Sequence, residues 1–178
     1  GYPYDSVSKI SYPKFRTPSK QYYISLRYGV WDSLAATYDP TRLCLIDVPV
    51  LKAHRLAGAT VAVKNWIGVL TTAYNAQRYG GWVPMHDNYF FSAYALVARV
   101  MAVTFPRLSI VDAEWTATEG PNNDTAVVQT KTLFGSTDPV AVSWYAAKFL
   151  LTPIAFYPEE TNPDLPTSKY HNFLTHWT

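Results

Sequence analysis

The amino-acid sequence predicts an α/β fold with a mainly parallel sheet and flanking helices. An apolar run at residues 42–50 is typical of a strand that is buried on both faces. Helix-like and strand-like segments follow it at 88–104, 107–115, 127–134 and 139–151. This mixture of strands and helices along one chain indicates the α/β class.

The segments that surround the main apolar run have weaker patterns. Residues 1–21 contain three prolines among Tyr, Ser and Lys, which predicts an extended arm. A helix is expected around residues 31–38, and a turn at 39–41 ends it before the strand. Residues 52–87 are Gly-rich and locally polar, which predicts a long loop with a short helix at 61–70. Ordered loops of this length are usually functional.

The C-terminal part begins with a clear helix signal. Asp138 can accept hydrogen bonds from free backbone N–H groups, and Pro139 suits the first position of a helix that runs to about residue 151. Residues 153–178 hold four prolines and are expected to be an irregular tail.

Length and composition favour one globular domain. The chain has 178 residues, of which 48% are hydrophobic, and this is enough for one core. We therefore expect a single domain over residues 1–178, with its core at 42–152. Because the sequence begins with Gly1 rather than Met, it could equally be a fragment of a longer chain.

The charge and the aromatic content bear on partners. The net charge of +2 lacks a clustered basic face, so a nucleic-acid partner is not expected. No run reaches the roughly 18 apolar residues of a membrane span, so no transmembrane segment is expected. Few charges and many Tyr and Trp residues favour contacts with a protein partner, self-association, or an exported, extracytoplasmic protein. A large aromatic core explains the same composition, and the compartment stays unknown.

The single cysteine limits the cofactors. One thiol excludes an iron–sulfur cluster held within this chain, because such clusters need several thiolates. Cys44 lies between two leucines, so we expect a buried and unreactive thiol.

Cationic side chains gather directly after the first predicted strand. Lys52 and His54 flank one residue and point to the same side if the backbone is extended, and Lys64 follows after the small residues that end at Thr60. Open α/β sheets bind anionic ligands at strand ends. Two lysines could neutralise a carboxylate or a phosphate, and a lysine beside another cation can have a lowered pKa and act as a nucleophile. The alternative is a set of solvated surface charges.

Five further residues are candidates for the same site. His86 could be an acid–base group, a metal ligand or a helix cap, and Arg78 a phosphate clamp or a surface charge. Asn65 could contact a ligand or stabilise a turn. Asp112, at the end of the second predicted strand, could bind a metal, orient a lysine or form a salt bridge, and Glu119 adds a carboxylate on the same side.

Several ordered blocks resemble the uncharacterised family called domain of unknown function three-six-two. The blocks are residues 49–54, 58–60, 64–68, 110–113 with 119–121, and 138–141. That family is often fused to ferredoxin-type iron–sulfur modules, so the resemblance implies a redox setting, although cluster cysteines are absent here. A more distant resemblance to the N-terminal domain of nickel-pincer lactate racemases implies proton or hydride relay by His54, cofactor binding by Lys64 and nickel ligation by His86.

The first hypothesis is an enzyme that acts on a small anionic substrate, with redox or isomerase chemistry. The second is a non-catalytic module that binds an anionic ligand or a protein partner, and the third is an aromatic-rich exported assembly protein. The cofactor stays unknown, and a bound metal is compatible with the histidines. The expected roles are catalysis by His54 and Lys64, ligand binding by Lys52, Thr60, Asn65, Arg78, Asp112 and Glu119, and metal binding by His86.

Overall fold

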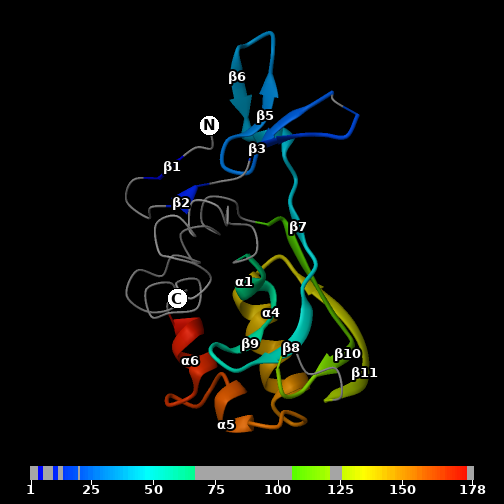
Figure 1. The fold of residues 1–178 in the computed structure, drawn as a ribbon, viewed down its shortest axis with the longest axis vertical. Helices are drawn as coiled ribbons and strands as arrows, with labels where there is room; N and C mark the ends of the chain where they lie inside the picture. Colours follow the sequence, from blue (N-terminus) through cyan, green and yellow to red (C-terminus); the bar gives the residue numbers. More distant parts are fainter. Residues whose placement is uncertain are drawn as a thin grey trace.

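The computed structural model shows a mixed α/β protein with two main sheets and a few helices (Figure 1). It describes residues 4–5, 10–11, 14–19, 21–66, 106–120 and 126–175. The helix expected at 88–104 lies outside the described residues. Within the described residues, no helix is long and apolar enough to cross a membrane.

The larger sheet has five strands and mixed pairing. Its order is β11 (Val127–Ser136), β10 (Leu108–Ala117), β8 (Val50–His54) and β9 (Gly58–Thr60), and β7 (Ile46–Asp47) also pairs with β10. Strand β10 is parallel to β7 and β8 but antiparallel to β11, and β8 is antiparallel to β9. The prediction of a mainly parallel sheet is therefore wrong. The β8–β9 and β10–β11 connections are too short for the crossover that a parallel pair needs.

The smaller sheet is antiparallel throughout. It holds β3 (Lys14–Arg16), β4 (Tyr23–Ser25), β5 (Gly29–Asp32) and β6 (Thr37–Asp39), and a separate pair joins β1 (Tyr4–Asp5) to β2 (Ile10–Ser11). The segment expected to be an extended arm thus contributes paired strands.

The helix expected at residues 31–38 is wrong, because this segment forms the β5–β6 hairpin. Trp31 lies opposite Tyr38, and their ring centroids are 5.1 Å apart in an edge-to-face arrangement. Asp32 Oδ1 accepts hydrogen bonds from the backbone N–H groups of Leu34 and Ala35, which closes the turn. A cross-strand aromatic pair and a side chain that caps the turn together favour the hairpin over a helix.

The apolar run at residues 42–50 is not one continuous buried strand. It contains the end of the 3-10 helix η1 (Pro40–Arg42), then β7, and then the start of β8. Burial alternates from Ile46 to Leu51, so only one face of this segment is covered. Cys44 is exposed, which corrects the expectation of a buried thiol.

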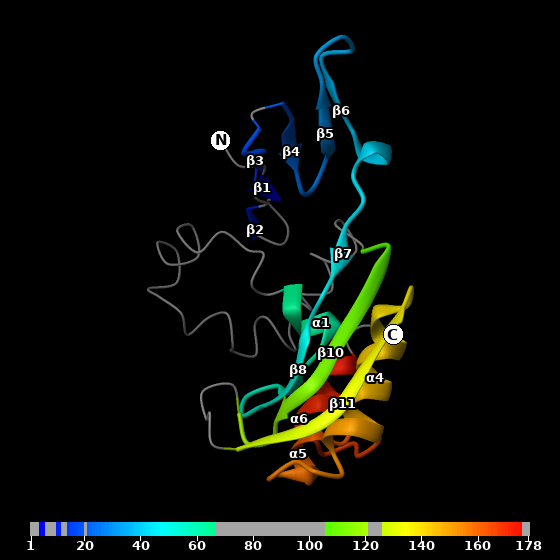
Figure 2. The ribbon, with the colours of Figure 1, turned by 90° about the vertical axis from the view of Figure 1, so that its right-hand side faces the viewer.

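Helices cover one face of the larger sheet (Figure 2). The longest among the described residues is α4 (Pro139–Tyr145), which continues as the π-helical turn η5 (Ala146–Leu151). Asp138 Oδ1 accepts hydrogen bonds from the N–H groups of Val140 and Ala141, which confirms the predicted helix start. The strands predicted at 107–115 and 127–134 are also confirmed, as β10 and β11.

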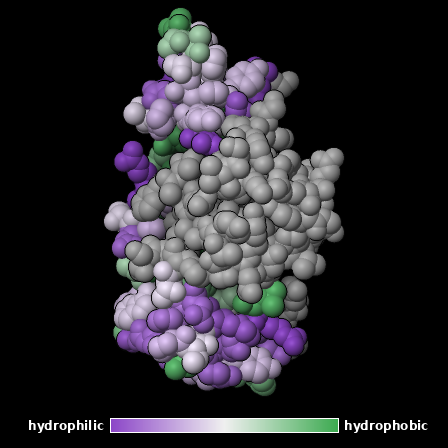
Figure 3. Space-filling model, turned by 90° about the vertical axis from the view of Figure 1, so that its left-hand side faces the viewer, coloured by the Kyte–Doolittle hydropathy of each residue, from purple (hydrophilic) through white to green (hydrophobic). Residues whose placement is uncertain are grey.

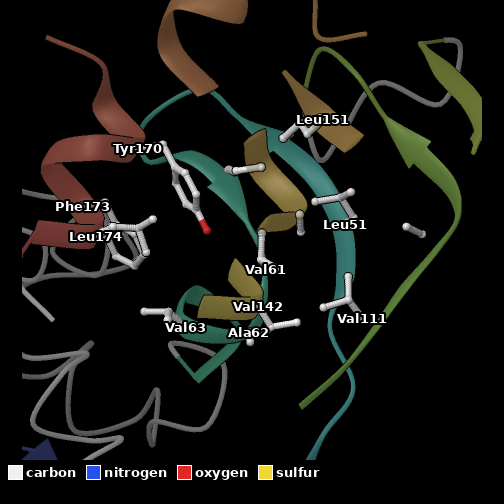
Figure 4. Packing of buried hydrophobic residues seen from close by; sticks show 14 of the residues in the cluster. Leu51, Val61, Ala62, Val63, Val111, Val142, Leu151, Tyr170, Phe173 and Leu174 are labelled. Carbon is white, nitrogen blue, oxygen red and sulfur yellow. The ribbon is translucent and has the colours of Figure 1, made fainter. Parts of the chain in front are cut away.

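The prolines predicted an irregular C-terminal tail, and this prediction is wrong. The tail forms α5 (Pro158–Thr161) and α6 (Lys169–Leu174), and α6 buries Tyr170, Phe173 and Leu174 in the core (Figure 4). The Tyr170 hydroxyl donates a 3.4 Å hydrogen bond to the Ser143 carbonyl. The short α1 (Ala62–Asn65) packs against α4 on the same side of the sheet.

Candidate functional site

Strand β8 presents Lys52 and His54 on one face of the sheet. Leu51 and Ala53 are buried in the core, whereas Lys52 and His54, which alternate with them, are half-buried on the other face. This confirms that the two side chains share a side, because side chains alternate across a strand.

Thr60 lies directly opposite Lys52 in the β8–β9 hairpin. Cross-strand partners in an antiparallel pair share a face of the sheet, so the Thr60 hydroxyl is on the side of Lys52. Thr60 is buried, and its Oγ1 has no hydrogen-bond partner among the described residues. A buried hydroxyl without a partner is unusual in a folded protein and is able to bind a ligand.

Lys64 is a buried lysine on α1. Its residue is 7% exposed, and α1 is held in place by the Val63 N–H, which donates a 3.2 Å hydrogen bond to Ser143 Oγ. Burial, and secondly the charge of Lys52, lower the pKa of Lys64 to about 8. The ion pairs found in the described residues join other side chains, so neither Lys52 nor Lys64 has an acidic partner there. The charge of Lys52 thus acts on a buried Lys64 that has no counter-charge among the described residues.

Asn65, the residue after Lys64, is used within the protein. Its Nδ2 donates a 2.6 Å hydrogen bond to Asp47 Oδ1. Asp47 is buried, and burial raises its pKa to about 6 although the Asn65 bond acts in the opposite direction. Its Oδ2 has no partner among the described residues. Asp47 was not among the residues predicted from the sequence, and the available signal was an acidic residue inside the apolar run at 42–50.

His54 has a structural role in the turn that follows β8. Its Nδ1 accepts hydrogen bonds from the backbone N–H groups of Leu56 and Ala57, both at 3.2 Å. A nitrogen that accepts these bonds carries no proton, so the neutral ring has its proton on Nε2. His54 therefore caps the β8–β9 turn.

A pocket of about 250 Å³ lies beside this turn, and neither Lys52 nor Lys64 lines it. His54 and Glu119 line it together with Arg55, Tyr157 and the Glu160–Lys169 ion pair of 2.8 Å. The surface around α5 and α6 is mostly hydrophilic (Figure 3). The structure thus brings the predicted residues His54 and Glu119 together in this pocket, whereas Lys52, Thr60 and Lys64 do not line it.

Asp112 does not line this pocket. Asp112 lies between Val50 and Leu133 in the register of the sheet, and its Oδ1 accepts a 3.0 Å hydrogen bond from the Glu114 N–H. Lys52, by contrast, is in register with Ala117 of β10. Arg78 and His86 lie outside the described residues. Within the described part of the chain, His, Cys, Asp and Glu side chains form no group of three or more that could hold a metal ion.

The fold and this geometry define a mixed α/β protein with a buried lysine, Lys64, that has no acidic partner in the part of the chain that the structure describes. The chain belongs to the family named Domain of unknown function (DUF362), whose model matches residues 29–148. The matched range includes Lys52, Thr60 and Lys64, and α5 and α6 follow it. No curated protein and no solved structure matches the sequence.

Proposed function

We propose that this protein binds a small anion, a carboxylate or a phosphate, between Lys52 and Lys64. The observation that carries the proposal is the burial of Lys64 beside a second lysine, without an acidic partner among the described residues. The Thr60 hydroxyl, opposite Lys52, supplies a further hydrogen-bond donor.

Burial makes the charged form of Lys64 energetically unfavourable unless an anion is bound to it. Burying an ammonium group without a partner costs several kcal/mol, and a second positive charge nearby adds repulsion. The lowered pKa of Lys64 reflects both effects. A bound anion offsets both the cost of burial and the repulsion, because its negative charge attracts the ammonium groups of Lys64 and Lys52. Binding should therefore raise the pKa of Lys64 and take up protons near pH 8.

The alternative is a lysine that is buried only as part of the core and stays neutral. Lys64 would then have no affinity for anions, and its aliphatic chain would act like that of a methionine. His54 does not enter the proposal, because its Nδ1 already caps the β8–β9 turn.

Isothermal titration calorimetry with inorganic phosphate and with propionate tests the proposal. At pH 8, in two buffers of different ionisation enthalpy, we expect binding with net proton uptake. Lys64→Met should abolish the uptake, and Lys52→Met should weaken binding by about tenfold, the effect of roughly 1.4 kcal/mol for one charged contact.

The control is Lys131→Met, which changes an exposed lysine on β11. It should leave binding and proton uptake unchanged. Equal binding by wild-type protein and Lys64→Met, or no binding of either anion by wild-type protein, would overturn the proposal.

A further inference from the structure

We propose that the pocket beside the β8–β9 turn binds the zwitterion of a small α-amino acid, with Arg55 holding its carboxylate and Glu119 its ammonium group. This pocket is separate from the proposed anion site, because neither Lys52 nor Lys64 lines it. The inference is carried by two side chains of opposite charge that line one cavity of about 250 Å³ and form no ion pair with each other.

The pocket lies at the carboxyl ends of two neighbouring parallel strands. Strand β8 ends at His54 and β10 ends at Ala117, and the two strands run in the same direction. Arg55 directly follows β8, and Glu119 comes two residues after the end of β10. In α/β proteins, ligands usually bind outside the carboxyl ends of the strands. The parallel pairing of β8 and β10 therefore explains why Arg55 and Glu119 reach the same cavity.

The opposite wall of the pocket comes from α5 and α6 and is fixed by contacts within the protein. The Phe156 N–H, just before α5, donates a 3.0 Å hydrogen bond to the Thr118 carbonyl. Lys169 of α6 forms a 2.8 Å ion pair with Glu160 of α5. Gly58 of β9 packs closely against both helices. The pocket is thus formed by the fold itself, and a ligand that enters it requires little ordering of the protein.

The charges on the walls select a ligand that carries one charge of each sign. Lys169 and Glu160 neutralise each other, whereas Arg55 takes part in none of the ion pairs of the described residues. A ligand with a carboxylate and an ammonium group can bridge Arg55 and Glu119 through charge-assisted hydrogen bonds. Because a carboxylate accepts up to about four hydrogen bonds, Glu119 can receive the ammonium group in addition to its other contacts.

The size and lining of the pocket limit the side chain of the amino acid. A water molecule occupies about 30 Å³ in the liquid, so a cavity of 250 Å³ has room for roughly eight waters or for a comparably small ligand. A charged side chain would find Lys169 and Glu160 already paired, whereas an aliphatic one can lie against Ala53 and Tyr157. We therefore expect amino acids with small aliphatic side chains, up to the size of leucine.

Isothermal titration calorimetry of the full chain with L-leucine at pH 7 tests the inference. Two analogues each lack one charged group and are smaller than leucine: 4-methylpentanoate has no ammonium group, and 3-methylbutylamine has no carboxylate. Each should bind at least about tenfold more weakly than leucine, because one charged contact is lost. Failure of leucine to bind, or binding of leucine and both analogues with the same affinity, would overturn the inference.

Variants assign each charged group of the ligand to its side chain. Arg55→Gln and Glu119→Gln should each weaken leucine binding at least about tenfold. Arg55→Gln should also remove the difference in affinity between leucine and 3-methylbutylamine, because the carboxylate then has no cation to bind. Glu119→Gln should remove the difference between leucine and 4-methylpentanoate. A merely structural role for either residue would instead weaken all three ligands alike.

The matched controls are Arg107→Gln and Glu159→Gln, because both residues are exposed and neither lines the pocket. They should leave leucine binding unchanged. Equal binding by wild type, Arg55→Gln and Glu119→Gln would show that the pocket is not the site. The same conclusion follows if Lys64→Met abolishes leucine binding and Arg55→Gln does not, because the carboxylate is then bound at the anion site. The comparison of leucine with its analogues on wild-type protein decides the inference even if Glu119→Gln fails to fold.

Discussion

Lys64 shows how burial changes the chemistry of a common residue. It lies between Val63 and Asn65, and neither neighbour distinguishes it from a surface lysine. In the fold it is nearly inaccessible, and burial, with a smaller effect from the charge of Lys52, lowers its pKa to about 8. Asp47 is the opposite case, since burial favours its neutral form, and its pKa rises to about 6.

The shift in the pKa of Lys64 predicts how stability depends on pH. Between pH 8 and 10.5 the unfolded chain holds a proton on Lys64 that the folded protein has lost, so the free energy of unfolding rises with pH in this window. Between pH 7 and 9.5, wild-type protein should gain about 2 kcal/mol relative to Lys64→Met. Urea denaturation at several pH values measures this difference.

The comparison with Lys64→Met isolates Lys64 from other titrating groups. Asp47 titrates between its ordinary value of 3.8 and about 6, below the window. Burial raises the pKa of Tyr170, which lowers stability only above about pH 10, where an ordinary tyrosine ionises. A difference between wild type and variant that does not change from pH 7 to 9.5 would contradict the assigned burial of the ammonium group.

At the scale of elements, side-chain caps position the parts that surround the site. His54 caps the β8–β9 turn, and Asp138 caps α4 through two backbone N–H groups, at 2.8 and 2.9 Å. Helix α4 in turn contacts α1 and strands β10 and β11. The position of Lys64 therefore depends on a helix whose start is set by one aspartate.

Replacing Asp138 should destabilise the protein through α4. In Asp138→Ala the backbone N–H groups of Val140 and Ala141 lose their acceptor, and the expected cost is about 1 kcal/mol in the free energy of unfolding. Asp138→Asn keeps an oxygen in the same place and should cost clearly less. Urea denaturation compares the two, and equal losses would show that the hydrogen bonds do not hold this helix end.

At the scale of the whole molecule, the edge strand β9 of the larger sheet packs against the C-terminal helices at Gly58. This residue has a φ of +79°, which favours glycine, and a Cβ built on it would lie 2.6 Å from Tyr170 Cβ. The carbonyl of Glu160 on α5 is in contact with the same position. Strand β9 thus approaches α5 and α6 at a point where only a hydrogen atom fits.

A methyl group at residue 58 should force these elements apart. For Gly58→Ala we expect a loss of about 2 to 4 kcal/mol in the free energy of unfolding, from the strained φ and from overpacking together. The matched control is Gly120→Ala, because a Cβ there meets nothing within 4 Å. It should change stability by less than about 0.5 kcal/mol. Similar losses for both variants, measured by urea denaturation, would contradict this account of the β9–helix contact.

The elements that the sequence analysis predicted well have strong local signals. Strands β10 and β11 each run for ten residues, and α4 starts at an Asp-Pro pair. The two tail helices were missed because four and six residues are too short for a helical period to show among prolines. The β5–β6 hairpin was missed because a helix was expected at residues 31–38. In a helix, Trp31 and Tyr38 would not pair across two strands, as they do in the structure.

For the site, the alternation of side chains along a strand could be predicted from neighbouring residues. The packing between distant segments could not. From residues 52 to 60 alone, Lys52 and His54 could be placed on one side of a strand. That His54 lines a pocket with Glu119, and that Lys52 and Lys64 do not line it, became visible only from the packing of α5 and α6. The buried Asp47 also became visible only there.

The sequence by itself determined the α/β class, the family resemblance, the β10 and β11 strands, the start of α4 and the shared side of Lys52 and His54. These features depend on residue period and on hydrogen bonds between near neighbours. Only the tertiary structure decided the mixed sheet, the helices of the tail and the burial of Lys64 without an acidic partner among the described residues. Strand pairing and solvent exclusion depend on contacts between segments far apart in the chain, and no local pattern encodes which segments will meet.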